Sequence, residues 1–169
     1  GVRMITVHGR TRCQFYKGAA DWSAIRAVRA ATALPLVVNG DIACYDDALA
    51  ALAVSGADAV MIGRGAQGKP WLPGQIGRRF DTGHEESMPS LPVQFGYVRD
   101  LYDAVVGHYG ARIGTRHARK HLGWALDTAA EAATASLDVL KRWRARILTA
   151  EDPALVHRAL AEAFDDFCE

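Results

Sequence analysis

Short apolar runs alternate with longer amphipathic stretches over the first half of the chain. Runs of this kind, rich in valine and isoleucine, are typical of parallel strands that are buried on both faces. The predicted strands cover residues 4–7, 36–38 and 59–62. Apolar residues at helical spacing predict helices over about residues 22–33, 45–54 and 70–80. This alternation predicts three βα units of a parallel sheet, which cannot by themselves close a barrel of eight strands.

Residues suited to helix ends lie near the expected boundaries. Asp21 is a candidate N-terminal cap for the first helix. Asp46 and Asp47 suit the positive end of the second helix, and Gly56 is expected to end it. Because the first predicted strand ends at residue 7, His8 is expected in the loop that follows it.

The second half of the chain shows helical periodicity alone. A polar stretch with glycine and proline over residues 81–92 is predicted to be a linker. Four apolar stripes follow, and the short breaks between them predict an antiparallel helical bundle over residues 93–169. The breaks lie at Gly110, near Thr134 and at Asp152-Pro153. The stripes are Phe95, Val98, Leu101/Tyr102 and Val105; Ala118, Leu122, Ala125/Leu126 and Ala129; Leu137, Leu140 and Ile147/Leu148; and Leu155, Leu160 and Phe164/Phe167. The predicted fold class is therefore α/β over residues 1–80, followed by an all-α domain.

The second and third predicted strands both end in small and polar residues. Asn39, Gly40 and Asp41 follow the second strand, and Gly63 and Arg64 follow the third. In α/β proteins the ligand site lies where parallel strands end and lead into helices. Glycine lets a ligand approach the backbone, and arginine can bind a phosphate through paired hydrogen bonds. We therefore interpret the two strand ends as one phosphate-binding corner, although Asn-Gly-Asp fits a turn and helix cap equally well.

The residues after the first predicted strand are less specific. His8 lies at the same end as the corner, but a single histidine is more often a structural group. Arg10 and Arg12 fit a solvated loop, and we interpret Cys13 as an unreactive thiol.

The net charge of +1 conceals an uneven distribution. Residues 111–148 contain eight Lys/Arg and three Asp/Glu, a net charge of +5, whereas residues 151–169 contain one Arg and six acids, a net charge of −5. A basic block within a balanced chain indicates a local docking face.

Part of this basic block has a defined geometry. Arg116, Lys120 and Trp124 are four residues apart, so they line one face of a helix, with Arg119 beside them. Cations and an aromatic ring on one stripe could hold a phosphate backbone and a stacked base. A solvated basic face with a packed tryptophan also explains the pattern, and the pattern taken alone favours it.

The remaining composition points to a reduced cytoplasmic protein. The chain has three cysteines, an odd number without the spacing of a disulfide framework. No apolar run approaches about 18 residues, so no membrane span is predicted. His117 and His121 lack the glutamate and the third ligand of a zinc-binding helix, so no metal site is predicted.

Four segments resemble the tRNA-dihydrouridine synthases, in order and at that family's spacing. They are Ile5-Thr6-Val7-His8-Gly9-Arg10-Thr11-Arg12, Val38-Asn39-Gly40-Asp41-Ile42, Met61-Ile62-Gly63-Arg64-Gly65-Ala66-Gln67-Gly68-Lys69-Pro70-Trp71 and Arg119-Lys120-His121-Leu122-Gly123-Trp124. The bacterial B type is the subtype that the chain resembles. The resemblance implies the last three βα units of an FMN-binding TIM barrel, followed by a helical tRNA-binding domain.

The resemblance also implies roles for individual residues and a reaction. His8 would contact the flavin, Asn39, Gly40 and Asp41 would line its surroundings, and Gly63 and Arg64 would hold its phosphate. The helical domain would bind tRNA, and the helix face of Arg116, Arg119, Lys120 and Trp124 is our candidate for the RNA-binding surface. The family reduces the C5–C6 double bond of specific uridines in tRNA, with FMN as cofactor and NADPH as the usual electron donor.

Two features of the family are missing from the 169 residues. The catalytic cysteine of an Asn-x-Gly-Cys-Pro type motif is absent, Cys13 does not match it, and the flavin-binding lysine is absent too. We therefore expect the chain to be the C-terminal portion of such an enzyme and to be inactive alone, with no catalytic residue of its own. An RNA-binding helical module without catalysis and another FMN-dependent TIM-barrel pyrimidine oxidoreductase remain alternatives. Self-association through an exposed strand edge is a further expectation.

Overall fold

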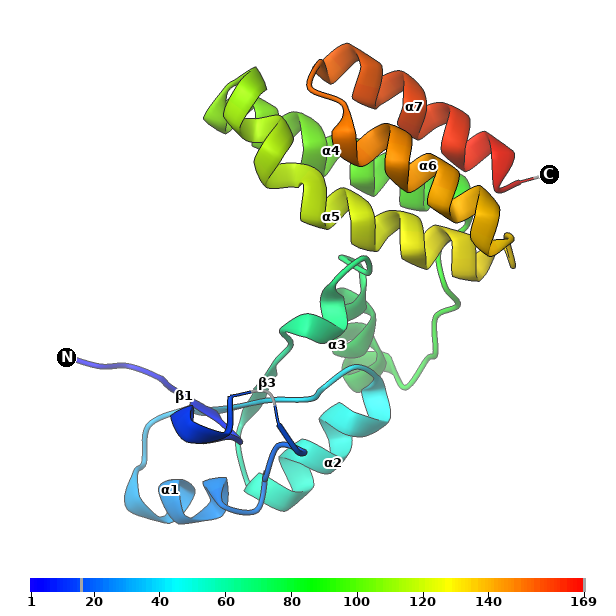
Figure 1. The fold of residues 1–169 in the computed structure, drawn as a ribbon. Helices are drawn as coiled ribbons and strands as arrows, with labels where there is room; N and C mark the ends of the chain where they lie inside the picture. Colours follow the sequence, from blue (N-terminus) through cyan, green and yellow to red (C-terminus); the bar gives the residue numbers. More distant parts are fainter. Residues whose placement is uncertain (16, 169) are drawn as a thin grey trace. The chain divides into compact units, whose positions relative to one another are not determined.

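The computed structural model describes residues 1–15 and 17–168. The chain divides into two compact units, the first made of Gly1–Ala66 with Trp71–Glu86 and the second of Gln67–Pro70 with Ser87–Glu169. The first unit is mixed α/β and the second is helical (Figure 1).

A parallel three-stranded sheet in the order β1-β2-β3 forms the centre of the first unit. Its strands are β1 (Ile5–His8), β2 (Leu36–Asn39) and β3 (Ala59–Met61). The helices of this unit are α1 (Ile25–Ala31), α2 (Tyr45–Ser55) and α3 (Leu72–Thr82), with short 3-10 turns at η1 (Arg12–Gln14) and η2 (Arg64–Ala66). The predicted three βα units are confirmed. His8 and Asn39, however, are the last residues of strands and pair in register, whereas His8 was expected in a loop.

The core of this unit lies on one face of the sheet. It combines the alternate strand residues Ile5, Val7, Leu36, Val38 and Val60 with Ile25 of α1, Ala48 and Ala51 of α2 and Ile76 of α3. On the opposite face Thr6, Ala59 and Met61 are exposed. The expectation of strands buried on both faces is therefore right for β2 only, because the helices cover one face and β2 alone has a strand on either side.

The first helix begins later than its sequence pattern predicts. The carboxylate of Asp21 accepts hydrogen bonds from the N–H groups of Ser23 and Ala24 and from the Ser23 hydroxyl. These bonds hold residues 22–24 in a turn, and regular helix starts only at Ile25. Hydrogen bonding from Ser23 and Ala24 keeps the pKa of Asp21 below its ordinary value. Asp21 thus caps the approach to α1, not a helix that starts at Trp22.

Both ends of α2 follow the prediction. The carboxylate of Asp47 accepts hydrogen bonds from the N–H groups of Ala43 and Cys44 at the N-terminal end. Gly56 ends the helix with a φ of 70°, a left-handed conformation that glycine adopts without steric cost.

Four helices make up most of the second unit: α4 (Leu91–Tyr109), α5 (Ala111–Ala132), α6 (Leu137–Thr149) and α7 (Pro153–Asp166). The connection before α4 spans residues 83–90, shorter than the predicted linker of 81–92. The breaks near Gly110, Thr134 and Asp152 are confirmed.

Three of the apolar stripes differ in part from the prediction. Leu101, Leu137 and Leu155 were expected in the core, yet they are 36%, 62% and 47% exposed. Trp143 and Val156 are buried there instead. In α6 the buried face starts only after the first turn of the helix. In α7 the buried face contains Val156 and Leu160, which are four residues apart, and Leu155 lies one position away from it.

A close backbone contact ties residues 67–70 to α5. Gly68 has a φ of +74°, and a Cβ atom on it would collide with Thr128 Oγ1 and with the backbone oxygen of Trp124. Glycine is therefore required both for the conformation and for the approach. No helix in residues 1–15 and 17–168 is long and apolar enough to cross a membrane.

Candidate functional site

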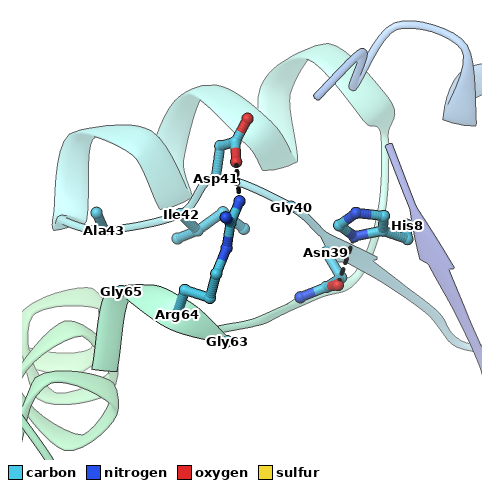
Figure 2. Close-up of a pocket in the computed structure, with 9 residues that line it drawn as sticks. All are labelled: His8, Asn39, Gly40, Asp41, Ile42, Ala43, Gly63, Arg64 and Gly65. Atoms are coloured by element: carbon cyan, nitrogen blue, oxygen red, sulfur yellow. Dashed lines mark hydrogen bonds and ion pairs between the residues drawn. The ribbon is translucent and has the colours of Figure 1, made fainter. Parts of the chain in front are cut away.

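The carboxyl ends of the three strands meet at a pocket of about 560 Å³ (Figure 2). Each of the six residues that the sequence suggested for a cofactor site lines it: His8, Asn39, Gly40, Asp41, Gly63 and Arg64. Ile42, Ala43 and Gly65 complete the lining. The parallel register brings these residues together, because His8 pairs with Asn39 and Asn39 pairs with Met61 just before Gly63.

The Asn-Gly-Asp segment is a tight turn as well as part of the pocket wall. Gly40 has a φ of 121° and Asp41 a φ of 54°, so both lie in the left-handed region. A Cβ atom on Gly40 would lie 2.8 Å from the Cβ atom of Ala20. The indole N–H of Trp22 donates a 2.8 Å hydrogen bond to the backbone oxygen of Gly40. The turn and the pocket, which the sequence offered as alternatives, are therefore the same feature.

A chain of hydrogen bonds crosses the three strand ends. Nδ1 of His8 lies 2.7 Å from Oδ1 of Asn39, and Nδ2 of Asn39 donates to the backbone oxygen of Met61 at 2.7 Å. The side chains of His8 and Asn39 turn toward one another beside the pocket (Figure 2). Asn39 therefore fixes the position of the His8 ring relative to the sheet.

Two arginines converge on Asp41. Arg10 forms an ion pair with one carboxylate oxygen and also donates to the backbone oxygen of Gly18 at 2.7 Å. Arg64 lies 3.5 Å from the other carboxylate oxygen and points toward Asp41 in Figure 2. The hydrogen bond from Arg10 is the main reason that the pKa of Asp41 lies below its ordinary value, and the backbone N–H of Ala20 and the charge of Arg64 act in the same direction.

The environment of Arg10 differs from the prediction. The sequence suggested a solvated loop, but the Arg10 side chain is only 3% exposed. Within the described part of the chain, its Nε and Nη1 atoms are buried and lack a hydrogen-bond partner. A buried guanidinium requires a carboxylate close by, which Asp41 supplies. The corner therefore carries two arginines and one aspartate, a formal charge of +1 before His8 is counted.

The glycines of the third strand end are not equivalent. A Cβ atom on Gly65 would collide with the backbone oxygen of Ile42 and approach Ala43 Cα to 2.8 Å. A Cβ atom on Gly63 would meet only Asn39 Nδ2, at 4.0 Å. Gly65 thus allows the two loops to touch, and Gly63 leaves open space beside the pocket. The corner can accept an anionic group between the exposed guanidinium of Arg64 and closely spaced backbone.

Sequence reasoning missed Arg10 and Trp22 as parts of this site. One signal could have identified Arg10. It lies two residues after His8, and Asp41 lies two residues after Asn39, the residue that pairs with His8. Opposite charges at equivalent positions after paired strand ends predict an ion pair. No comparable pattern marks Trp22.

The residues suggested for RNA binding border two hollows on the helical unit. Arg116 and Lys120 line one together with Ile113 and His117. Lys120 also borders the second hollow, whose other lining residues are Arg119, Gly123, Trp124, Arg144 and Leu148. Arg119 is half-buried; one of its terminal nitrogens lies 3.5 Å from the backbone oxygen of Ala150, and its buried Nε has no partner among the described residues. Arg116 and Lys120 are the exposed cations of this set.

The arginines of α6, unlike the exposed cations of α5, form ion pairs. Arg142 pairs with Asp166, Arg144 with Asp127 and Arg146 with Glu162, each at 2.6 Å. Their charges are therefore largely neutralised by carboxylates of the same unit. Most of the free positive charge in the basic block belongs to α5.

The other groups that could carry chemistry are dispersed. Cys13, Cys44 and Cys168 are free and exposed. In residues 1–15 and 17–168 there is no group of three or more His, Cys, Asp or Glu side chains that could hold a metal ion.

Comparison with known proteins identifies similar sequences along the whole chain. The family model described as dihydrouridine synthase (Dus) matches residues 1–166. A Rickettsia conorii protein named "Probable tRNA-dihydrouridine synthase" is 43% identical over 169 residues, which is 100% of this chain and 49% of the relative. A Rhodobacter capsulatus protein of the same name is 47% identical over 166 residues, 98% of this chain and 48% of the relative. The "tRNA-dihydrouridine synthase B" of Serratia marcescens is 42% identical over 132 residues, 75% of this chain and 38% of the relative.

The chain spans about half the length of the first two of these relatives. The comparisons therefore concern the half of those proteins that corresponds to the three βα units and the four-helix unit.

Proposed function

The chain belongs to the dihydrouridine synthase family, and on this premise we propose that it is the C-terminal portion of a flavin-dependent tRNA-dihydrouridine synthase. The complete enzyme would reduce the C5–C6 bond of uridines in tRNA with electrons from NADPH. In this proposal the three βα units belong to a TIM barrel and the helical unit binds tRNA. The enzyme would act in the cytoplasm.

The observation that carries the proposal is the pocket at the three strand ends. Its residues fit the phosphate of FMN in charge, because Arg10 and Arg64 exceed the single carboxylate of Asp41. They fit it in shape, because Gly63 leaves open space and Gly65 brings the neighbouring loop close. A volume of about 560 Å³ lies within the range of about 300–1,000 Å³ that is typical of small-molecule sites.

The residues of this chain would bind and orient the cofactor. Bound FMN would supply the hydride chemistry that reduces the uracil ring. Arg64 would leave its long contact with Asp41 to bind the phosphate, and Arg10 would keep Asp41 ionised and in place. His8, whose ring is fixed by Asn39, would present its free ring nitrogen to the cofactor. The 169 residues contain no Asn-x-Gly-Cys-Pro motif, so the catalytic cysteine would come from another part of the enzyme, and this chain would be inactive alone.

A chimera tests the proposal in a complete protein. This chain would replace the corresponding half of the Rhodobacter capsulatus relative, to which it is 47% identical over 166 residues. We expect the purified chimera to contain flavin and to form dihydrouridine in tRNA. Arg64→Ala should lower its flavin content at least about fivefold, because one charge-assisted contact to phosphate contributes about 1.5–3 kcal/mol.

The matched control is Arg99→Ala, which removes an exposed arginine of the helical unit and should leave the flavin content unchanged. A chimera that folds but contains no flavin, or one whose flavin content is the same with and without Arg64, would contradict the proposed role of the corner.

A further inference from the structure

The first half of α5 borders a hollow of about 530 Å³. Its lining residues Ile113, Arg116, His117 and Lys120 recur at intervals of three and four, so they share one helix face. All four are exposed. The hollow therefore combines two cations, one aliphatic side chain and one imidazole ring on a single surface.

The cations of this surface are not used by the fold. Residues 111–126 contain Arg112, Arg116, Arg119 and Lys120 and no acidic residue. Of these, Arg112 lies in the first turn of α5, where the helix dipole disfavours positive charge. Among the described residues, Arg112, Arg116 and Lys120 form no ion pair, whereas each arginine of α6 does. Because these cations have no acidic partner on this face, their charge is available to an anion from outside this unit.

An aromatic pair adjoins the cations. The rings of Tyr109 and His117 stack with centroids 4.9 Å apart and planes only 9° from parallel. Tyr109 is 50% exposed, and its ring forms a T-shaped pair with that of its neighbour His108, with centroids 4.5 Å apart. Stacked, exposed rings of this kind are suited to receive the flat face of a base.

The α4–α5 connection fixes this pair in place. Gly110, with a φ of 77°, makes the turn directly after Tyr109. A Cβ atom on Gly114 would lie 2.6 Å from Val106 Cα, so only glycine allows α4 and α5 to approach so closely at this point. Tyr109 and His117 therefore lie on two helices that are joined by a one-residue turn and packed closely together.

We propose that this hollow binds one unpaired nucleotide of an RNA, with its base stacked against the Tyr109–His117 pair and its phosphates held by Arg116 and Lys120. The proposal rests on the proposed function, which makes an RNA the substrate. Cations alone would suit any polyanion, but the parallel rings beside them specify a ligand with alternating phosphates and flat bases. The volume of about 530 Å³ accommodates a small molecule of nucleotide size.

Two oligomers of equal charge distinguish base stacking from charge attraction. The first is a fluorescein-labelled single-stranded uridine pentamer, and the second is the same backbone with abasic sugars throughout. Fluorescence anisotropy with the full chain at low salt should give at least about fivefold tighter binding of the pentamer that carries bases, because one stacked base contributes on the order of 1–3 kcal/mol. Equal affinity for the two oligomers, or no binding of either, would overturn the proposal.

Variants assign the effect to the hollow. His117→Ala and Tyr109→Ala should remove most of the preference for bases and leave binding of the abasic oligomer unchanged, whereas His117→Phe should keep the preference because it retains a flat ring. Lys120→Ala should weaken both oligomers and reduce the slope of log affinity against log salt by about 0.7, the value for one lost phosphate contact on a single strand. A loss of the preference in His117→Phe equal to that in His117→Ala would also overturn the proposal.

Matched substitutions outside the hollow serve as controls. His84→Ala removes an exposed histidine of the other unit, and Lys141→Ala removes an exposed lysine of α6. Both should bind like the unaltered chain. If the chain shows no preference for bases while the chimera contains a normal amount of flavin, this inference is wrong and the proposed function stands. If the chain prefers bases while the chimera contains no flavin, the proposed flavin site is wrong and the nucleotide-binding hollow stands.

Discussion

His8 and Asn39 are joined through Nδ1 of the imidazole and Oδ1 of the amide, 2.7 Å apart. The amide nitrogen of Asn39 is committed as a donor to the backbone oxygen of Met61. Oδ1 therefore acts as the acceptor, and Nδ1 of His8 must carry the hydrogen. In the neutral ring this leaves Nε2 as an acceptor beside the pocket. Three adjacent strand ends thus determine which nitrogen of His8 is available to a ligand.

The first prediction concerns this tautomer. ¹⁵N spectra of the His8 ring at neutral pH should show hydrogen on Nδ1 and a lone pair on Nε2. Asn39→Ala should bring the two nitrogen shifts closer together, because nothing then selects one tautomer. The exposed His84 should be the same in both proteins. A hydrogen on Nε2 in the unaltered chain would show that Asn39 does not set the tautomer.

The second prediction concerns the support of Asp41 for buried Arg10. Asp41→Asn should destabilise the first unit by about 3 kcal/mol in urea denaturation, because it leaves a buried guanidinium without its counter-charge. Asparagine tolerates the left-handed φ of 54° at this position, so backbone strain does not add to the loss. Arg64→Ala should cost less than about 1 kcal/mol, since the Arg64 side chain is 55% exposed and its contact with Asp41 is long.

The pH dependence of the same comparison checks its electrostatic origin. Because the folded state lowers the pKa of Asp41, its contribution is complete above the ordinary carboxyl pKa of about 3.9 and is lost as the pH falls toward the lower folded value. The difference in unfolding free energy between the unaltered chain and Asp41→Asn should be constant from about pH 7 to pH 5 and should shrink below about pH 4. A difference that persists unchanged into acid would point to lost packing.

The third prediction separates two glycines of one loop. Gly65→Ala should destabilise the first unit by about 1–3 kcal/mol and displace the loop after β2, since the new Cβ collides with the backbone oxygen of Ile42. Gly63→Ala should cost less than about 1 kcal/mol, because its Cβ meets only one atom at 4.0 Å. Thermal unfolding of the two variants provides the comparison, and equal losses would contradict the close approach of the two loops.

Much of this site could be predicted from the sequence because parallel strands impose it. Once three strand–helix units are recognised, the residues that follow each strand must lie at one edge of the sheet, which brought His8, Asn39 and Arg64 together without further information. The pairing of Arg10 with Asp41 depends on register, which the pattern alone did not supply. Trp22 reaches Gly40 from the turn before α1, which the helical pattern did not predict.

The helical half was less predictable for a related reason. Apolar spacing located the helices, but a stripe can be assigned one position wrongly, as Leu155 and Val156 show. The charge pattern could not distinguish cations that the fold neutralises from those that it leaves free. That distinction required the ion pairs of Arg142, Arg144 and Arg146.

A titration of the isotopically labelled chain, of 18.3 kDa, with FMN tests the central claim most directly. If the strand-end corner binds the phosphate of a flavin nucleotide, the backbone amide signals of Gly63 and Gly65 and the Arg64 side-chain signal should shift with FMN. Riboflavin, which has the same ring system without the phosphate, should leave them nearly unchanged, and Arg64→Ala should abolish the difference between the two ligands. Equal shifts with FMN and riboflavin, or shifts with FMN confined to residues outside the corner, would contradict the account.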